Sequence, residues 1–323
     1  MRNALWGAAT VFLSWGFLSL ATAQAQTPRA PEKIIIDTDI GDDVDDAFAV
    51  ALALKSPEFE ILGFTAPFGD THTRAKMLDR ILTEAGRGDI AVAMGVSSNA
   101  NLVGFNQRRY AEGGKSYRAS YRDSTDFILE QIRRHPGEIT LVAVGPLPNI
   151  GALIDRDIAT FRKLKRVAIM GGSFQPIPNP YGLGTPIAPM PEWNIKNDIA
   201  SAQKLFTSGV PVVVMPLDST IGLKLHEVAR NLLLAQGTPL TDMLTIVYHQ
   251  WHVGTRNTTP TLFDPMVLAW LADPSLCPVT PMHVRVRDDG MTVAENGAPN
   301  AQVCLKSDNE AFLRFYMGRV GRK

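Results

Sequence analysis

Short apolar runs alternate with longer amphipathic segments over the first two thirds of the 323-residue chain. Most of the short runs are continuously apolar, which is typical of strands covered on both faces. We predict such strands at 34–36, 61–65, 90–93, 140–144, 167–170 and 210–215. The amphipathic segments predict helices at 46–55, 73–85, 125–135, 148–154 and 198–208. This strand–helix–strand order indicates a parallel sheet with right-handed crossovers.

The last third of the chain has a different pattern. It predicts helices at 240–251 and 265–271, followed by a late strand pair at 284–286 and 302–305. The chain contains neither an internal repeat nor a low-complexity linker that would mark a domain boundary. We therefore expect residues 26–323 to form a single α/β domain, built on a mostly parallel, Rossmann-like sheet flanked by helices.

Residues 1–25 have the features of an export signal. A basic residue near the start precedes the apolar run 4–20, and small residues follow it. This pattern predicts cleavage after Ala23 or Ala25 and a periplasmic or secreted mature protein. The alternative is a membrane anchor, but the apolar core is at the lower limit for a span and no basic stop-transfer cluster follows. We therefore expect the mature form to have no membrane segment.

Composition narrows the range of partners. The 32 Lys and Arg residues balance the 32 Asp and Glu residues, so no net charge favours binding to nucleic acid or to an anionic membrane. The two cysteines are too few for a disulfide scaffold and lack the spacing of a zinc site. An oxidising destination permits a Cys277–Cys304 disulfide, while two separate buried thiols are equally open, since the sequence gives no distance.

Acidic residues concentrate directly after the first predicted strand, where parallel sheets bind ligands. Six of the ten residues 37–46 are aspartates. Two carboxylates 4 Å apart repel by about 1 kcal/mol in water and by several times more in a partly dry cleft. A helix start accommodates Asp45 and Asp46, but it does not explain why Asp39 and Asp46 flank a glycine-containing turn. A bound cation explains both, and oxygen ligands without a nearby His or Cys favour Ca²⁺ or Mg²⁺ over Zn²⁺.

The acidic loop belongs to a longer series of motifs. Ile34-Ile35-Ile36-Asp37-Thr38-Asp39, followed by Gly41 and Asp45-Asp46-Ala47, resembles the amino-terminal signature of the nucleoside hydrolases, the inosine-uridine-type nucleoside N-ribohydrolases. The resemblance covers most of residues 33–315 and continues in order through Gly69-Asp70, Val144-Gly145-Pro146-Leu147-Pro148-Asn149, Gly171-Gly172, Glu192-Trp193-Asn194 and Asp264-Pro265. In the more frequent signature a proline follows the second aspartate and the loop is two residues shorter. This chain has Ile40 and the longer loop.

The resemblance implies a Ca²⁺ ion at the bottom of a cleft. Its carboxylate ligands would be Asp39, Asp46 and Asp264, and Val144 would offer its backbone carbonyl. Water and the ribose 2′- and 3′-hydroxyls would complete the six to eight oxygens that calcium takes. Asp264, which precedes a proline, has a simpler alternative role as a helix N-cap.

The implied reaction is hydrolysis of the N-glycosidic bond of a ribonucleoside to ribose and free base. The metal lowers the pKa of water, Asp39 accepts its proton as general base, and positive charge develops on the sugar ring. Asp45 and Asn194 would bind the 2′- and 3′-hydroxyls and Glu192 the 5′-hydroxyl. Asp70 stands where many relatives have Asn, near the attacking water. The alternative for Glu192 and Asn194 is capping of the helix predicted near residue 198.

The group that assists the departing base is the weakest match. Some relatives have a histidine directly before the aspartate matched by Asp264, and this chain has Phe263. His249 and His252 lie three residues apart on a predicted helix, and Trp251 between them offers stacking against the base. The missing histidine keeps open a non-catalytic alternative, a periplasmic nucleoside- or ribose-binding protein. The expected partner is a small-molecule nucleoside of undetermined base, and the sequence leaves a homo-oligomer open.

Overall fold

The structure is a computed structural model that describes residues 30–98, 105–114, 118–179 and 184–322. The predicted export signal lies outside the described residues. Residues Pro31–Lys323 group into one unit. Across the described ranges, no helix combines the length and the apolar character needed to cross a bilayer.

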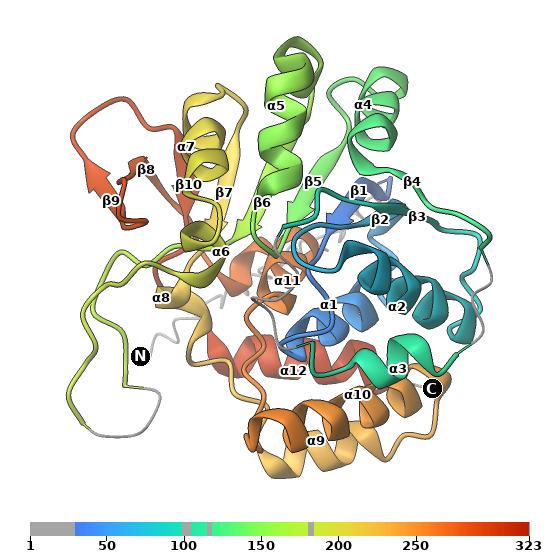
Figure 1. The fold of residues 1–323 in the computed structure, drawn as a ribbon. Coiled ribbons are helices and arrows are strands. Elements are labelled where there is room, and N and C mark those ends of the chain that lie inside the picture. Colours follow the sequence, from blue (N-terminus) through green and yellow to red (C-terminus); the bar gives the residue numbers. More distant parts are fainter. Residues whose placement is uncertain (1–29, 99–104, 115–117, 180–183, 323) are drawn as a thin grey trace, which may run out of the picture. The chain divides into compact units, whose positions relative to one another are not determined.

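A ten-stranded sheet runs through this unit in the order β4-β3-β2-β1-β5-β6-β7-β10-β8-β9 (Figure 1). Neighbours from β4 to β10 pair in parallel, and β8 pairs antiparallel with both β10 and β9. The strands are β1 Glu32–Asp37, β2 Phe59–Ala66, β3 Ala91–Met94, β4 Arg122–Asp123, β5 Thr140–Ala143, β6 Arg166–Met170, β7 Val212–Met215, β8 Thr280–Val286, β9 Thr292–Glu295 and β10 Ala301–Val303. The predicted mostly parallel α/β sheet is therefore confirmed.

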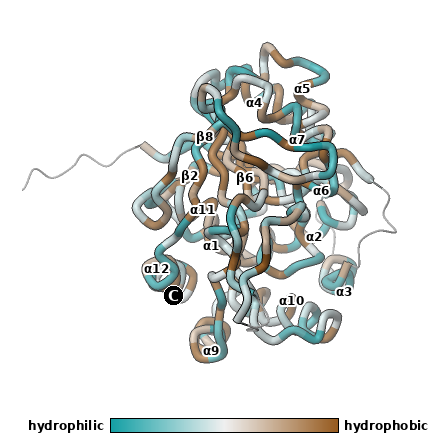
Figure 2. The backbone as a smooth tube through the Cα atoms, turned by 90° about the vertical axis from the view of Figure 1, so that its left-hand side faces the viewer, coloured by the Kyte–Doolittle hydropathy of each residue, from teal (hydrophilic) through white to brown (hydrophobic). Residues whose placement is uncertain are grey.

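Helices cover both faces of the sheet (Figure 1). The described helices are α1 Asp45–Leu54, α2 Thr71–Glu84, α3 Arg108–Glu112, α4 Ser124–Arg134, α5 Pro148–Phe161, α6 Trp193–Lys196, α7 Ile199–Thr207, α8 Leu217–Thr220, α9 Glu227–Leu234, α10 Pro239–Thr255, α11 Pro265–Ala272, the 3₁₀ helix η2 Pro274–Leu276 and α12 Asn309–Val320. Side chains alternate across β1, so Ile34 and Ile36 join the cluster that contains α1 and α11, while Ile35 packs with α4, α5 and α7. Figure 2 shows the hydrophobic colouring of strands such as β6 between these layers.

Every predicted strand and helix is present, with bounds shifted by a few residues. The largest shift is in the predicted helix 148–154, which extends to Phe161 through a kink at Asp157. The prediction missed α9, α12 and the shorter elements; α12 buries Phe312, Tyr316 and Val320. Short elements such as the two-residue strand β4 depend on a neighbour for their hydrogen bonds, and no local pattern announces them.

The order of the strands reverses at β1. Its neighbours are β2 on one side and β5 on the other, and successive strands extend outward from each. A crevice forms at such a switch point, beyond the carboxyl ends of the strands. The acidic loop leaves β1 here, and Val144 follows β5, with its amide donating to the Asp37 carbonyl at 2.9 Å.

The two cysteines form a disulfide. Cys277 follows η2 and Cys304 follows β10, and their Cα atoms are 5.7 Å apart. Both are fully buried. The structure thus decides between the two alternatives that the sequence left open.

Candidate active site

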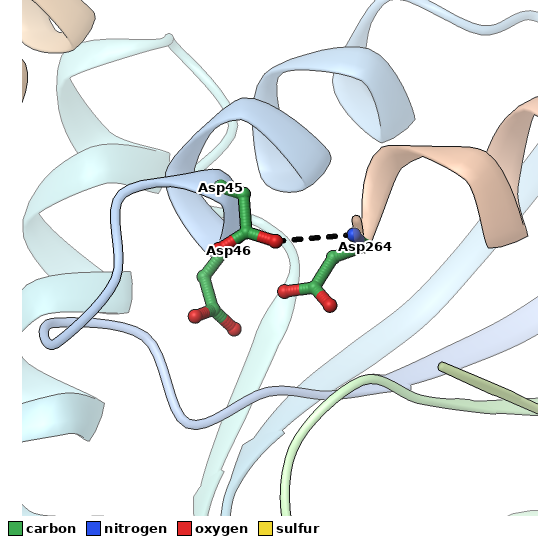
Figure 3. A group of neighbouring side chains, drawn as sticks. All are labelled: Asp45, Asp46 and Asp264. Carbon is green, nitrogen blue, oxygen red and sulfur yellow. Dashed lines mark hydrogen bonds between the residues drawn. The ribbon is translucent and has the colours of Figure 1, made fainter. Parts of the chain in front are cut away.

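Three aspartates at the starts of two helices that are far apart in the sequence meet at the switch point. Asp45 and Asp46 occupy the first turn of α1, and Asp264 precedes α11. One carboxylate oxygen from each lies within 4.8 Å of the others, and all three side chains are buried (Figure 3). The Thr38 hydroxyl donates to the Asp46 carboxylate and fixes one of them.

Asp264 is more than a helix cap. It occupies the N-cap position of α11, but its side chain accepts no capping hydrogen bond. Instead its backbone amide donates to Asp45 Oδ2 at 3.1 Å, and its carboxylate faces the Asp45–Asp46 pair (Figure 3). The carboxylate is therefore placed for ligation rather than for closing the helix end.

A cavity of about 750 Å³ opens over these carboxylates. Asp39 and Val144 also line it, although Asp39 is not among the three aspartates whose oxygens lie within 4.8 Å of one another. Asp39 packs against Gly145, where a Cβ atom would lie 2.7 Å from Asp39 Oδ1. The absence of a side chain at Gly145 thus leaves room for this carboxylate beside Val144.

Burial perturbs the pKa of every carboxyl group in the cluster. It raises the pKa of Asp39 to about 7, against the opposing effect of the Arg74 guanidinium. Burial, followed by repulsion from neighbouring carboxylates, raises the pKa of Asp45, Asp46 and Asp264 well above its usual value. Such clustered shifts characterise functional sites. A divalent cation among these oxygens would offset the desolvation and the repulsion together.

Glu192 and Asn194 lie on another wall of the same cavity. Glu192 caps the short helix α6, accepting from the amides of Asn194 at 3.0 Å and Ile195 at 3.2 Å, and from Gly172 at 3.1 Å. The capping alternative thus holds for Glu192 at α6, whereas the helix near residue 198 is capped by Asp198 and not by Glu192 or Asn194. Asn194 Nδ2 donates to the carbonyl oxygen of Val144 at 3.1 Å. This amide links the predicted ribose-binding wall to the predicted metal ligand.

Asp70 lies apart from this group. It caps α2 by accepting from the Thr73 amide at 3.1 Å, and its other oxygen pairs with Arg108 at 3.0 Å. Although burial works in the other direction, these hydrogen bonds hold the pKa of Asp70 below its usual value. Asp70 is absent from the described lining of the cavity.

The three residues proposed to assist the leaving group differ in their position relative to the cavity. Trp251 is buried and lines the cavity. His249 is exposed, and His252 stacks on Tyr248 with its Nδ1 2.6 Å from the Asn257 carbonyl oxygen. Neither histidine belongs to the described cavity lining. Spacing places residues 249 and 252 on one helix face, but it does not reveal which face α10 turns to the cleft.

The cavity also has members that the sequence did not single out as site residues: Asp42, Asp43, Asn106, Lys196 and Asn257. The two aspartates could have been included from their place in the acidic loop. The other three have no local signal, because they approach the cleft from separate elements. Burial raises the pKa of Asp43, against the opposing effects of hydrogen bonds from the Val44 amide and Trp251 and of the Lys224 charge.

The donor set fits a metal ion. It consists of carboxylate oxygens from Asp45, Asp46 and Asp264, with Asp39 and Val144 lining the same space. Hard oxygen donors of this kind suit Ca²⁺, Mg²⁺ or Mn²⁺ rather than a thiophilic metal.

Fold and site together define an α/β protein with an acidic cleft of the metal-binding type. A family model described as inosine-uridine preferring nucleoside hydrolase matches residues 34–314. Uridine nucleosidase 1 of Arabidopsis thaliana is 32% identical over 281 residues, which cover 81% of this chain and 80% of that protein. The pyrimidine-specific ribonucleoside hydrolase RihA of Citrobacter koseri is 30% identical over 316 residues, covering 89% and 97%. Among solved structures, the plant nucleoside hydrolase PpNRh1 matches with a TM-score of 0.77 and 28% identity, over 91% of this chain and 100% of that one.

The chain belongs to the inosine-uridine preferring nucleoside hydrolase family. It is a hydrolase that acts on nucleosides, and its substrate is a small molecule. Members of the family are metal-dependent, which agrees with the carboxylate cluster. The resemblance drawn from the sequence motifs is confirmed.

Proposed function

We propose that this chain is a calcium-dependent ribonucleoside hydrolase in which Asp39 is the general base. The observation that carries the proposal is the buried cluster of Asp45, Asp46 and Asp264, with Asp39 on the wall of the same cavity. Three or more carboxylates held together in a dry site favour a hard divalent cation. Calcium suits such a site because it accepts many oxygen ligands in a flexible geometry.

Asp39, Asp46 and Asp264 would hold the ion with the carbonyl oxygen of Val144. When bound, the cation lowers the pKa of water and so supplies a nucleophile at neutral pH. Asp39 would accept a proton from the water that attacks C1′ of the ribose, as the C1′–N bond breaks and its electron pair goes to the departing base. Burial raises the pKa of Asp39 to about 7 in the metal-free site, and a bound cation would lower it and so keep the carboxylate ionised. The buried carboxylates stabilise the positive charge that develops on the sugar ring.

The same cavity would hold the sugar beside the cation. We assign the 2′- and 3′-hydroxyls to Asp45 and Asn194 and the 5′-hydroxyl to Glu192. The cavity volume of about 750 Å³ is sufficient for a nucleoside. Trp251 offers an aromatic surface for the base, while His249 and His252 remain candidates for protonating it only if α10 rearranges on binding. Asp70 is left out of these substrate contacts, because it pairs with Arg108 and is absent from the described cavity lining.

The decisive assay uses metal-stripped protein supplied with Ca²⁺, Mg²⁺ or Zn²⁺ and a nucleoside panel, with released reducing sugar as the readout. The panel begins with uridine and cytidine because two relatives are named for uridine and pyrimidine nucleosides. We expect sugar release that depends on Ca²⁺. Binding of nucleoside without release would instead support the non-catalytic binding protein, which family membership disfavours.

Replacement of Asp39 tests the general base. Asp39→Ala should lower kcat by about 10²- to 10⁴-fold, the usual contribution of a positioned base, and should weaken calcium binding measured by calorimetry. Asp198→Asn is a matched control, because Asp198 only caps α7, and it should retain wild-type turnover. Unchanged turnover in Asp39→Ala would contradict the assignment.

We also propose export. The disulfide between Cys277 and Cys304 supports it, since disulfides persist in oxidising compartments. The test is expression of the full chain in a Gram-negative bacterium, followed by fractionation and sequencing of the mature amino terminus. We expect periplasmic protein that begins at Gln24 or Gln26. A cytoplasmic product that retains residues 1–25 would contradict the proposal.

A further inference from the structure

The backbone of the acidic loop is held from outside the cavity. Its five consecutive carbonyl oxygens, from Asp39 to Asp43, all accept hydrogen bonds from elements other than the loop itself. Buried carbonyls need such partners, because an unpaired one costs roughly as much as a lost hydrogen bond. Each donor therefore also fixes the direction in which the adjoining side chain points.

Arg74, on α2, supplies the first set of these bonds. Its Nη1 donates to the carbonyl oxygens of Asp39 and, at 2.8 Å, of Ile40. Its Nε donates to the Phe68 carbonyl at 2.8 Å, and its Nη2 pairs with Asp42 Oδ2 at 2.7 Å. The side chain is 1% exposed. A guanidinium is the group that can satisfy four acceptors at once, because its donors lie in one rigid plane.

The segment that leads into α3 supplies the second set. The Gln107 amide donates to the Gly41 carbonyl at 3.0 Å, and Gln107 Nε2 donates to the Asp43 carbonyl at 2.9 Å. Asn106 Nδ2 donates to the Asp42 carbonyl at 3.1 Å. The two sets thus divide the loop between them, with Arg74 on its first half and residues 106–107 on its second.

Phe105 directly precedes the second set of donors and packs against Arg74, which supplies the first set. Its ring lies 5.3 Å from the Arg74 guanidinium and occupies the space where a Cβ atom on Gly41 would fall. Gly41 has a φ of +123°, a conformation that an L side chain rarely adopts. Ring, guanidinium and glycine therefore fit together as one packed unit behind the loop.

We propose that Arg74 is a positioning residue for the cation site, which it presets by holding the backbone of Asp39 and Ile40 and the carboxylate of Asp42. This inference rests on the proposed function, because it concerns the same site. The loop here is longer than the frequent form of the family signature, and a longer loop has more conformations to lose on binding. Arg74 removes that freedom before the cation arrives. Its bonds to Asp39 act through the backbone, which leaves the Asp39 carboxylate directed to the cavity.

Positioning and simple charge compensation make opposite predictions. Arg74 is a buried cation beside acidic groups, so its positive charge alone opposes a second cation. If charge were its whole effect, removing it would tighten calcium binding. If it positions the loop, removing it loosens the site and weakens calcium binding. If Arg74 only stabilised the fold, its removal would lower the melting temperature and leave the affinity for calcium unchanged.

The test measures calcium affinity by calorimetry on metal-stripped protein, the melting temperature with and without calcium, and kcat and KM on uridine or the best substrate. Arg74→Met should raise the Kd for calcium by about 10- to 100-fold, the range found when groups that orient metal ligands are removed. Its kcat/KM should fall at low calcium and recover in part as calcium is raised. Arg74→Lys should resemble Arg74→Met, since lysine keeps the charge but not the planar set of donors.

Arg80→Met is the matched control. Arg80 lies on the same helix, pairs with Glu84 at 2.7 Å, donates to the Tyr110 carbonyl and covers the Tyr110 ring at 4.0 Å. The Arg80→Met variant therefore loses the same kinds of contact as Arg74→Met, but away from the loop, and it should keep wild-type calcium affinity. Gln107→Leu removes the side-chain hydrogen bond to the second half of the loop and should also weaken calcium binding. It provides the test should the Arg74 variants not fold.

The outcomes are distinct. Wild-type protein that binds no calcium would overturn the proposed function. Wild-type protein that binds calcium, with Arg74→Met and Gln107→Leu equal to it or tighter, would overturn this inference alone. Restoration of wild-type affinity by Arg74→Lys would also overturn it, because the planar set of donors would then be unnecessary.

Discussion

The two ends of strand β1 both carry acidic residues, partly buried at the start and buried at the other end, and their surroundings differ. At the start, Glu32 is bound by Lys165 at 2.8 Å, by Arg166 at 3.0 Å and by the Thr140 hydroxyl. These partners hold its pKa below the usual value despite partial burial. At the other end, the aspartates after β1 crowd together, and burial raises the pKa of Asp39 to about 7.

The difference separates a carboxylate that stabilises the fold from carboxylates kept for function. Protein cations satisfy Glu32 within the fold itself. The cluster around Asp264 is balanced less fully, with Arg74 directed mostly to backbone carbonyls and to Asp42. Unpaired buried charge is costly, so the fold tolerates it where an added cation completes the balance. The predictions that follow test this contrast.

The largest effect is expected at the functional end. Asp264→Asn removes one of the three clustered carboxylates but keeps the shape of the side chain. Turnover should fall by at least about 100-fold, more than is lost when only a supporting group is removed. The metal-free protein should melt at the same temperature or higher, because the change relieves repulsion. Steady-state kinetics and calorimetric melting of metal-stripped protein provide the two measurements.

Glu32→Gln is the control for this experiment, because it neutralises a carboxylate at the other end of the same strand. It should show the reverse pattern, with turnover kept and stability reduced. If Asp264→Asn lowered the stability of the metal-free protein as much as Glu32→Gln does, the two ends would not differ in the way described.

The next effect is the response of metal-free stability to pH. At the functional end the folded pKa of Asp37 and Asp39 is raised to about 7 by burial. Their contribution to stability is therefore fully present below the unfolded pKa near 4 and is lost as pH rises through about 7. Metal-stripped protein should therefore have a lower melting temperature at pH 8 than at pH 5.

Calcium should reverse most of this loss at pH 8 and have little effect at pH 5, because protons then compete for the same oxygens. Glu32 has the opposite sign. Its lowered pKa contributes stability above the unfolded value near 4.5 and loses it as pH falls further. A melting temperature of the metal-free protein that rose between pH 5 and pH 8 would contradict the expected sign at the functional end.

Part of the fold and part of the site could be predicted from the sequence. Continuous apolar runs identified the parallel strands, and the rule that ligands bind beyond their carboxyl ends located the acidic loop. The carboxylates of Asp46 and Asp264 meet as the family resemblance implied. Asp264 was identified only through the family resemblance, because its own position before a proline indicates no more than a helix N-cap.

Residues whose role depends on the direction of a side chain were harder to predict. Arg74 lies 35 positions from Asp39 on a helix whose pattern gives no reason to connect them. Asp70 matches a family block, yet its carboxylate caps α2 and pairs with Arg108. His249 and His252 share a helix face that only the packing of α10 assigns. Local spacing determines which residues share a face, whereas the tertiary contacts determine what that face meets.

The smallest effect is expected at the structural end. Glu32→Gln should lower the free energy of unfolding by about 1–2 kcal/mol, because it removes a partly buried acceptor of charge-assisted hydrogen bonds and leaves Lys165 and Arg166 without their shared carboxylate. Urea unfolding at pH 7 measures this change, and a loss that disappears at pH 3 would show that the ionised carboxylate is responsible. Calcium affinity should stay at the wild-type value, because Glu32 lies at the end of β1 away from the cavity. A weakened affinity for calcium would show that the two ends of the strand are coupled and that the contrast between them is not local.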